Sequence, residues 1–287
     1  MRIDAHQHFW TYDRRNYGWI GEGMEVLAQD FGAEDLRPLL GAARLDSSIV
    51  VQARHDLAES DELLEIAAAH EHLIGVVAWV DLESDVVGEE LDRRLGAKLL
   101  GIRHLLQDEE DDRHMLRPAF QRGIVELTKR KLAYDLLLHP RHLPIALELV
   151  DNHPEQTFIL DHLAKPKIAS GQIDDWCKDL KRLSLRPQVA IKLSGLVTEA
   201  DWGNWTAEDL WPYLDAAFEA FGPERVMFGS DWPVCLLAAS YNKVVDVVQQ
   251  WSEGFSSAEQ HALWGGNAAR LYRVNQSSSI RALDSQP

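Results

Sequence analysis

Eight short runs of β-branched and aliphatic residues recur along this chain, and they start roughly every 30 residues, the length of one βα unit. Each run is continuous or nearly so, as expected of strands that are covered on both faces. Between them lie segments with the apolar spacing of a helix, such as Glu59–His72, Pro118–Arg130 and Leu143–Asp151. The runs are Arg2–Ala5, Ser47–Ala53, Leu73–Val80, Lys98–Arg103, Leu132–Leu138, Thr157–Leu160, Val189–Leu193 and Arg225–Gly229.

Eight alternating units predict an α/β fold, a single closed (β/α)8 TIM-like barrel, although a chain of 287 residues is long enough for two domains. The alternative is a doubly wound open sheet. Such a sheet often has a glycine-rich first turn, whereas the first run here leads into His6-Gln7-His8-Phe9-Trp10. We therefore expect a barrel over residues 1–274 with its active site at the C-terminal ends of the strands, followed by a polar, disordered tail over 275–287.

The 12 histidines are the informative part of the composition, because five fall at predicted strand ends, where barrels place reactive residues. These are His6, His8, His104, His139 and His162. One histidine at such a position is more commonly a hydrogen-bonded core residue. However, His6, His8 and His162 are expected to converge with Asp231 on one mouth, where imidazoles and a carboxylate suit a zinc-like ion. The other histidines are interpreted as solvated or structural: His55, His70, His72, His114, His142, His153 and His261.

The charge and cysteine content exclude several classes of function. With 46 acidic residues against 29 lysines and arginines, the formal charge of −17 argues against nucleic acids and anionic membranes as partners. No apolar run approaches the ~20 residues of a membrane span, and the N-terminus lacks the apolar stretch of a signal peptide. Cys177 and Cys235 lie in dissimilar contexts, which favours a reducing cytoplasm over a disulfide framework. The acidic run 108–112 is interpreted as a solvated loop. Homo-oligomerisation is left open.

Several motifs resemble the amidohydrolase superfamily: His6-Gln7-His8, Asp231 and the closing Gly266-Asn267-Ala268-Ala269-Arg270-Leu271-Tyr272. Four segments resemble its lactonase branch more narrowly, and the likeness runs from residue 2 to about residue 273. This branch includes lactonases of L-fuconolactone, L-rhamnonolactone and 2-pyrone-4,6-dicarboxylate. The four segments are Asp4-Ala5-His6-Gln7-His8-Phe9-Trp10, Gly101-Ile102-Arg103-His104, Asp161-His162-Leu163-Ala164-Lys165-Pro166 and Phe228-Gly229-Ser230-Asp231-Trp232-Pro233-Val234-Cys235.

The resemblance implies hydrolysis of a sugar-acid lactone, an L-fuconolactone-like 1,4 or 1,5 ring, to the aldonic acid. It implies that His6, His8, His162 and Asp231 surround the hydrolytic centre and ligate a divalent metal. Asp231 is then the general base, and His162 and Arg103 act with it, Arg103 on a lactone oxygen. The superfamily often has a carbamylated lysine at the end of the fourth strand, between two metals. Here that region reads Arg103-His104. We therefore expect one zinc ion at most, and some members of the branch work without a tightly held metal.

A sugar-acid lactone also needs groups that bind its hydroxyls and stack on its C–H faces. Six tryptophans fall at or beyond predicted strand ends, namely Trp10, Trp19, Trp79, Trp202, Trp205 and Trp232, and each is as consistent with loop core as with a sugar platform. We expect the substrate to contact Trp10 and Trp232, together with Arg103, His104, His139 and Lys165.

Two other functions remain open from the sequence. A decarboxylase of an aromatic or unsaturated acid is one, because related barrels host such lyases, but it would need more basic residues than Arg103 around the acid group. A non-catalytic sugar-binding barrel is the other, and it would have no chemical need for all four of His6, His8, His162 and Asp231. The fold itself cannot decide between these functions.

Overall fold

The computed structural model of the protein describes residues 1–96 and 98–274, so the predicted tail over 275–287 lies outside the described residues. Eight parallel strands pair in chain order, and each predicted apolar run overlaps one of them. A parallel bridge between Gln7 and Trp232 joins β1 to the segment that follows β8, which confirms the closed (β/α)8 barrel. The strands are β1 Ile3–Gln7, β2 Ser47–Val51, β3 Leu73–Ala78, β4 Leu99–His104, β5 Ala133–Leu136, β6 Phe158–Leu160, β7 Val189–Leu193 and β8 Val226–Phe228.

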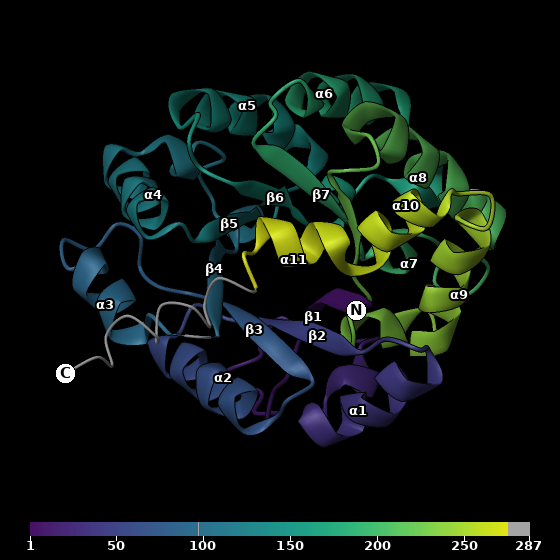
Figure 1. The fold of residues 1–287 in the computed structure, drawn as a ribbon, viewed down its shortest axis with the longest axis horizontal. Helices are drawn as coiled ribbons and strands as arrows, with labels where there is room; N and C mark the ends of the chain where they lie inside the picture. The colour runs from purple at the N-terminus through teal and green to yellow at the C-terminus, as the bar shows by residue number, and fades with distance from the viewer. Residues whose placement is uncertain (97, 275–287) are drawn as a thin grey trace.

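Helices connect successive strands and encircle the barrel (Figure 1). The helical spacing of the sequence located α4 to the residue, and it placed α2 and α5 within a few residues of their observed ends. The helices are α1 Ala33–Ala42, α2 Leu57–Ala69, α3 Val87–Arg94, α4 Pro118–Arg130, α5 Leu143–Asn152, α6 Asp174–Ser184, α7 Leu196–Glu199, α8 Ala207–Phe221, α9 Tyr241–Trp251, α10 Ser257–His261 and α11 Asn267–Leu271.

The apolar core has two parts because successive residues of a strand point to opposite faces. Phe158 and Leu160 of β6 belong to the larger cluster, between the sheet and the helices. Ile159 between them belongs to a smaller cluster inside the barrel, which also contains Tyr272 just beyond α11. In Figure 1, α11 crosses the end of the barrel that faces the viewer. The apolar part of the interior therefore lies at this end and leaves the opposite end for polar side chains.

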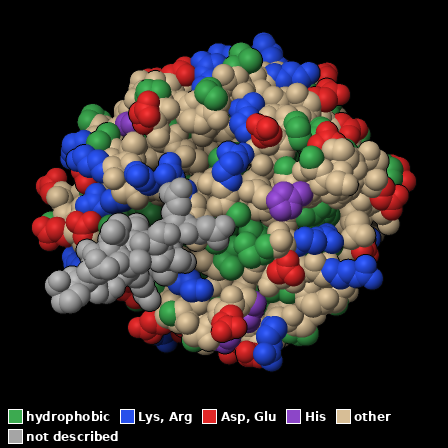
Figure 2. Space-filling model, viewed as in Figure 1, with side chains coloured by type: hydrophobic (Ala, Val, Ile, Leu, Met, Phe, Trp, Pro, Cys, Tyr) green, Lys and Arg blue, Asp and Glu red, His purple; other side chains and the backbone are tan. Residues whose placement is uncertain are grey.

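The surface around α11 is charged. In Figure 2, acidic and basic side chains are interspersed over this face of the molecule. None of the described helices is long and apolar enough to cross a membrane.

An irregularity in β1 aims its last residues into the barrel. Asp4 pairs with Ser48 and Gln7 with Val50, so β1 uses one residue more than β2 over the same length. Such a bulge redirects the side chains that follow it. Ile3 and Ala5 face the interior before the irregularity, and His6 does so after it.

Asp4 ties β1 to the segment that follows β8. Its buried carboxylate accepts hydrogen bonds from the backbone N–H groups of His6 (3.2 Å) and Ser230 (2.9 Å). It also accepts from the hydroxyls of Ser230 (2.6 Å) and Tyr241 (3.0 Å). Because these donors have no water around them, the carboxylate is needed to satisfy all four.

We predict that Asp4→Ala lowers the free energy of unfolding by about 3 kcal/mol, because it leaves several buried donors without an acceptor. Asp4→Asn should cost much less, since its amide oxygen still accepts from backbone N–H groups and its amino group can donate to the two hydroxyls. Urea denaturation followed by tryptophan fluorescence measures both. Asp85→Ala is the control, because the Asp85 side chain is 97% exposed. Equal stability of Asp4→Ala and this control would contradict the role of Asp4.

Candidate active site

A cavity of about 260 Å³ opens at the C-terminal ends of the strands. This volume lies near the lower end of the range for small-molecule sites, so the cavity suits one small ring. Its polar lining includes His8, Arg103, His162 and Asp231, which the sequence had placed at one mouth. His6 is fully buried directly behind them.

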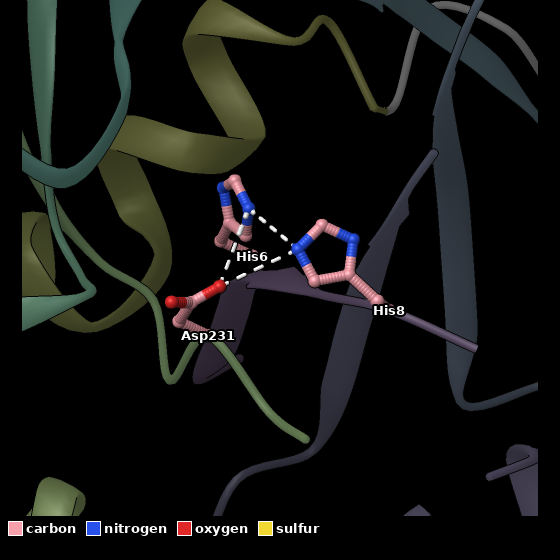
Figure 3. Close-up of side chains that lie close together, drawn as sticks. All are labelled: His6, His8 and Asp231. Atoms are coloured by element: carbon pink, nitrogen blue, oxygen red, sulfur yellow. Dashed lines mark hydrogen bonds and ion pairs between the residues drawn. The ribbon is translucent and has the colours of Figure 1, made fainter. Parts of the chain in front are cut away.

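His6 of β1 and His8 just after this strand point toward Asp231, which follows the neighbouring strand β8 (Figure 3). The Nε2 atoms of His6 and His8 lie 3.2 Å apart. Asp231 Oδ1 lies 3.4 Å from His8 Nε2 and 3.9 Å from His6 Nε2. His162 completes the group, with its Nε2 3.8 Å from the same oxygen. The predicted convergence of these four side chains is therefore present in the structure.

Neighbouring groups orient the imidazoles. His8 Nδ1 donates to the carbonyl oxygen of Val51 at 2.8 Å, which leaves the lone pair of Nε2 directed at Asp231 and His6. His162 Nδ1 lies 2.9 Å from the Ser194 hydroxyl. His6 Nδ1 lies 3.3 Å from Asp161 Oδ1 and 3.2 Å from Lys192 Nζ.

Burial and mutual contact set the charges of these residues. Burial lowers the pKa of His162 to about 4 and moves the pKa of His6 well below its ordinary value, so both imidazoles are neutral at neutral pH. Burial alone would raise the pKa of Asp231, but the imidazoles of His162, His8 and His6 hold it well below its ordinary value. The mouth thus combines neutral imidazoles with an ionised carboxylate.

This donor set fits a divalent metal. Tetrahedral zinc with bonds of about 2.1 Å separates its ligand atoms by roughly 3.4 Å, close to the 3.2 and 3.4 Å separations found here. The Nε2 atoms of His6 and His8 are thus close enough to share a proton or a cation. Within the described part of the chain, Asp231 Oδ1 is buried without a hydrogen-bond partner. Both observations favour a cation at the point where His6, His8 and Asp231 converge.

A layer of buried charges lies beneath the mouth. Lys192 is fully buried, and its Nζ lies 2.5 Å from Asp135 Oδ2 and 3.0 Å from Asp161 Oδ1. Arg103 Nη1 donates to Asp161 Oδ2 at 3.0 Å and lies 3.2 Å from His6 Nε2. Tyr272 donates to Asp135 from below. The guanidinium of Arg103 lines the cavity as expected, but it is also the ion-pair partner of Asp161, a role that sequence reasoning missed.

His162 and Lys165 belong to a left-handed turn. Residues 162–165 all have positive φ between 52° and 56°, and Lys165 N–H donates to the His162 carbonyl at 2.7 Å. Each such residue costs roughly 1–2 kcal/mol. With three residues per turn, positions 162 and 165 share one side, and both line the cavity. Gly195 faces this turn at φ +65°, and a Cβ there would lie 2.7 Å from the His162 ring, so glycine is required.

The two predicted tryptophan platforms lie elsewhere. Trp10 and Trp232 are 4% and 2% exposed and pack around Phe31 in the loop core, so the expectation that they contact substrate is corrected. The cavity is instead lined by Trp19 and Trp202, each 40% exposed. Trp10 packs edge-on against Trp19 and so supports it from behind. Trp19 lies in the connection between β1 and α1, and Trp202 lies in the connection between α7 and α8. The length of these connections is the signal that could have identified them.

His104 and His139 lie beside the cavity and are not among the described residues that line it. His104 Nε2 lies 2.7 Å from Glu109 Oε1, in a cluster with the rings of His55 and His114. Glu109 thereby anchors the acidic run 108–112, so this run is not simply a solvated loop. His139 is half-buried, and its backbone N–H donates to His142 Nδ1. Lys165 does line the cavity, together with Thr198 and Glu199, which sequence reasoning missed.

The similarity of the whole sequence to known proteins agrees with the geometry of this site. The amidohydrolase family model matches residues 3–274. The chain belongs to the amidohydrolase family. Two relatives are L-fucono-1,5-lactonases. The one from Burkholderia multivorans is 46% identical over 98% of this chain and 99% of its own. The one from Burkholderia ambifaria is 36% identical over 97% of each chain.

A solved amidohydrolase structure supports the same fold. A crystal structure from Burkholderia multivorans with bound zinc superposes with a TM-score of 0.92 at 45% identity. The match covers 95% of this chain and 99% of that one. The agreement extends over the whole barrel and includes the strands that carry the mouth of this amidohydrolase.

We predict that Lys192→Met lowers the free energy of unfolding by about 3–5 kcal/mol, because it removes the cation shared by two buried carboxylates. Urea denaturation of the variant measures this loss. Lys178→Met makes the same change at an exposed position of α6 and should be nearly neutral. If the two variants are equally stable, the buried layer does not depend on Lys192.

Proposed function

We propose that this protein is a lactonase that opens a sugar-acid lactone, an L-fucono-1,5-lactone or a closely related ring, to the aldonic acid. The observation that carries the proposal is the match over almost the whole length to two L-fucono-1,5-lactonases. The site supports it, because an ionised carboxylate and neutral imidazoles line a cavity of one-ring size. The free thiols Cys177 and Cys235 favour the cytoplasm as its location.

We propose that His6, His8, His162 and Asp231 hold one zinc ion. The donor atoms of His6, His8 and Asp231 lie close together, His162 lies beside Asp231, and the crystal structure of a relative contains zinc. Bound zinc would acidify a water molecule and polarise the lactone carbonyl. The charge beneath the mouth favours one ion over two. The carboxylates of Asp135, Asp161 and Asp231 outnumber the cations Arg103 and Lys192 by one, so a single divalent ion changes the net charge of this group from −1 to +1. A second ion would raise it to +3 in a buried site.

Each residue of the site then has a separate role in the hydrolysis. Asp231 takes a proton from the attacking water and passes it to the ring oxygen as the ring opens. His162 lies beside Asp231, with its Nε2 3.8 Å from Asp231 Oδ1, and the Ser194 hydroxyl orients its ring. Arg103 supplies a fixed positive charge near the oxyanion that develops on the carbonyl. The indoles of Trp19 and Trp202 offer apolar faces to the C–H groups of the sugar ring.

The experiment that tests this function is a pH-indicator screen of sugar-acid 1,4- and 1,5-lactones. We expect the wild-type protein to hydrolyse at least one of them, and Asp231→Asn to lower kcat by about a thousandfold, because an amide cannot act as the base. Asparagine tolerates the positive φ of 58° at this position, so the variant should fold normally. Asp85→Asn is the control. Near-normal turnover by Asp231→Asn would exclude it as the base, and no hydrolysis by the wild-type protein would exclude the function.

We also predict one zinc ion per chain by elemental analysis of protein dialysed against zinc. His8→Ala should lower zinc affinity at least about a hundredfold, because it removes a ligand whose orientation is already fixed by Val51. His261→Ala, an exposed histidine at the end of α10, should leave the zinc content unchanged. Two ions per chain would contradict the charge argument for a mononuclear site.

A further inference from the structure

Lys165 and Glu199 face each other in the cavity wall, but their charged groups do not come within hydrogen-bond distance. Lys165 Nζ lies 3.8 Å from Glu199 Oε1, beyond hydrogen-bond distance. Their side chains are 22% and 23% exposed, and both line the cavity. Open pairs of this kind also occur on the outer surface, where Arg122 Nη2 lies 3.6 Å from Asp85 Oδ1. Lys165 and Glu199 differ from these pairs in their place, because both line the cavity and are only partly exposed to water.

The polar atoms of this pair remain available to a ligand. Within the described residues, neither the Lys165 amine nor the Glu199 carboxylate makes a direct hydrogen bond. A partly buried ammonium and carboxylate lose hydration without gaining a full hydrogen bond in return. Such an arrangement becomes favourable once a third group beside the pair accepts a hydrogen bond from the amine and donates one to the carboxylate.

The backbone fixes the separation of the two groups. Lys165 ends the left-handed turn that also carries His162, and Glu199 ends α7, which begins after Gly195 in its left-handed conformation. The Thr198 carbonyl accepts a hydrogen bond from Trp202 Nε1 at 2.9 Å, which anchors the end of α7 to the lining indole. Strained backbone is retained mainly where it positions functional groups. Both groups are thus placed by structure that also places the metal-ligand histidine and a wall of the cavity.

A hydroxyl group suits this space, because it accepts one hydrogen bond and donates another. A carboxylate ligand would be repelled by Glu199, and a methylene would leave both charges without a partner. We propose that Lys165 and Glu199 together bind the ring hydroxyl next to the reacting carbonyl of the lactone. In this arrangement the Lys165 amine donates to the hydroxyl oxygen, and the hydroxyl donates to Glu199 Oε1. The inference rests on the proposed lactonase function and assigns the residues that select a hydroxylated ring.

The position of the pair supports the choice of hydroxyl. Lys165 shares its turn with His162, which belongs to the hydrolytic centre. Glu199 and Asp231 line the same cavity. Burial together with the negative charge of Asp231 raises the pKa of Glu199. The ring hydroxyl bound here is therefore close to the lactone carbonyl that is hydrolysed with Asp231 as the base. This hydroxyl is the one on C2.

The test compares kcat/KM for the preferred aldonolactone with that for its 2-deoxy counterpart. We expect the wild-type protein to prefer the hydroxylated lactone by about 10- to 100-fold, the effect of hydrogen bonds to charged groups. Lys165→Met and Glu199→Met should each reduce this preference to within about threefold, with the loss falling on the hydroxylated substrate. Methionine is unbranched at Cβ like lysine, so it adds no strain to the left-handed turn. Lys167→Met, an exposed lysine two residues on, is the matched control and should keep the full preference.

The double variant adds a second measurement. Because both residues bind the same hydroxyl, Lys165→Met/Glu199→Met should lose little more than either single variant. Equal losses on both substrates, an unchanged preference in the single variants, or additive losses in the double variant would each overturn the proposal. A wild-type protein that opens lactones without preferring the 2-hydroxyl would overturn it too. A wild-type protein that opens no lactone would instead refute the proposed function.

Discussion

The carboxylate of Asp161 is the interaction on which the rest of the site depends. Oδ1 lies 3.0 Å from Lys192 Nζ and 3.3 Å from His6 Nδ1, and Oδ2 accepts from Arg103 at 3.0 Å. Burial alone would raise the pKa of Asp161, but Lys192, His6 and Arg103 hold it well below its ordinary value. A charge at this depth is tolerated only when its partners are in place. One buried anion therefore fixes the orientation of His6 and the position of the cation that lines the cavity.

The depressed pKa of Asp231 follows from the same crowding, and it defines how this residue can work. A carboxylate with a low pKa is a weak base, so Asp231 accepts a proton efficiently only from water that is already acidified. The conjugate acid is correspondingly strong and releases the proton readily to the ring oxygen. The imidazoles that lower its pKa are the same groups that converge on the proposed metal position. Base strength and metal binding are thus set by one arrangement of side chains.

The sequence was sufficient for the barrel and for the residues at its mouth. Strand periodicity predicts closure, and closure brings His8, His162 and Asp231 together without knowledge of any loop. The buried layer could also have been anticipated, because Asp135 and Lys192 interrupt otherwise apolar strands and must therefore be paired. The choice of tryptophans could not, because strand register does not determine which indole of a long loop turns inward. Trp10 lies nearer the first strand than Trp19, yet it is the residue that packs in the core.

The rim of the cavity depends on contacts between distant segments. The left-handed turn after β6 is unfavourable in isolation, and three contacts from outside the turn support it. Ser194 meets the His162 ring, Trp176 donates to the Leu163 carbonyl, and Gly195 leaves space for the imidazole. These residues are far from the turn in the sequence, and no local pattern predicts the conformation they stabilise. Local periodicity therefore predicts which residues stand at the strand ends of the barrel. Tertiary packing decides the direction in which the side chains of Lys165 and Glu199 face the substrate.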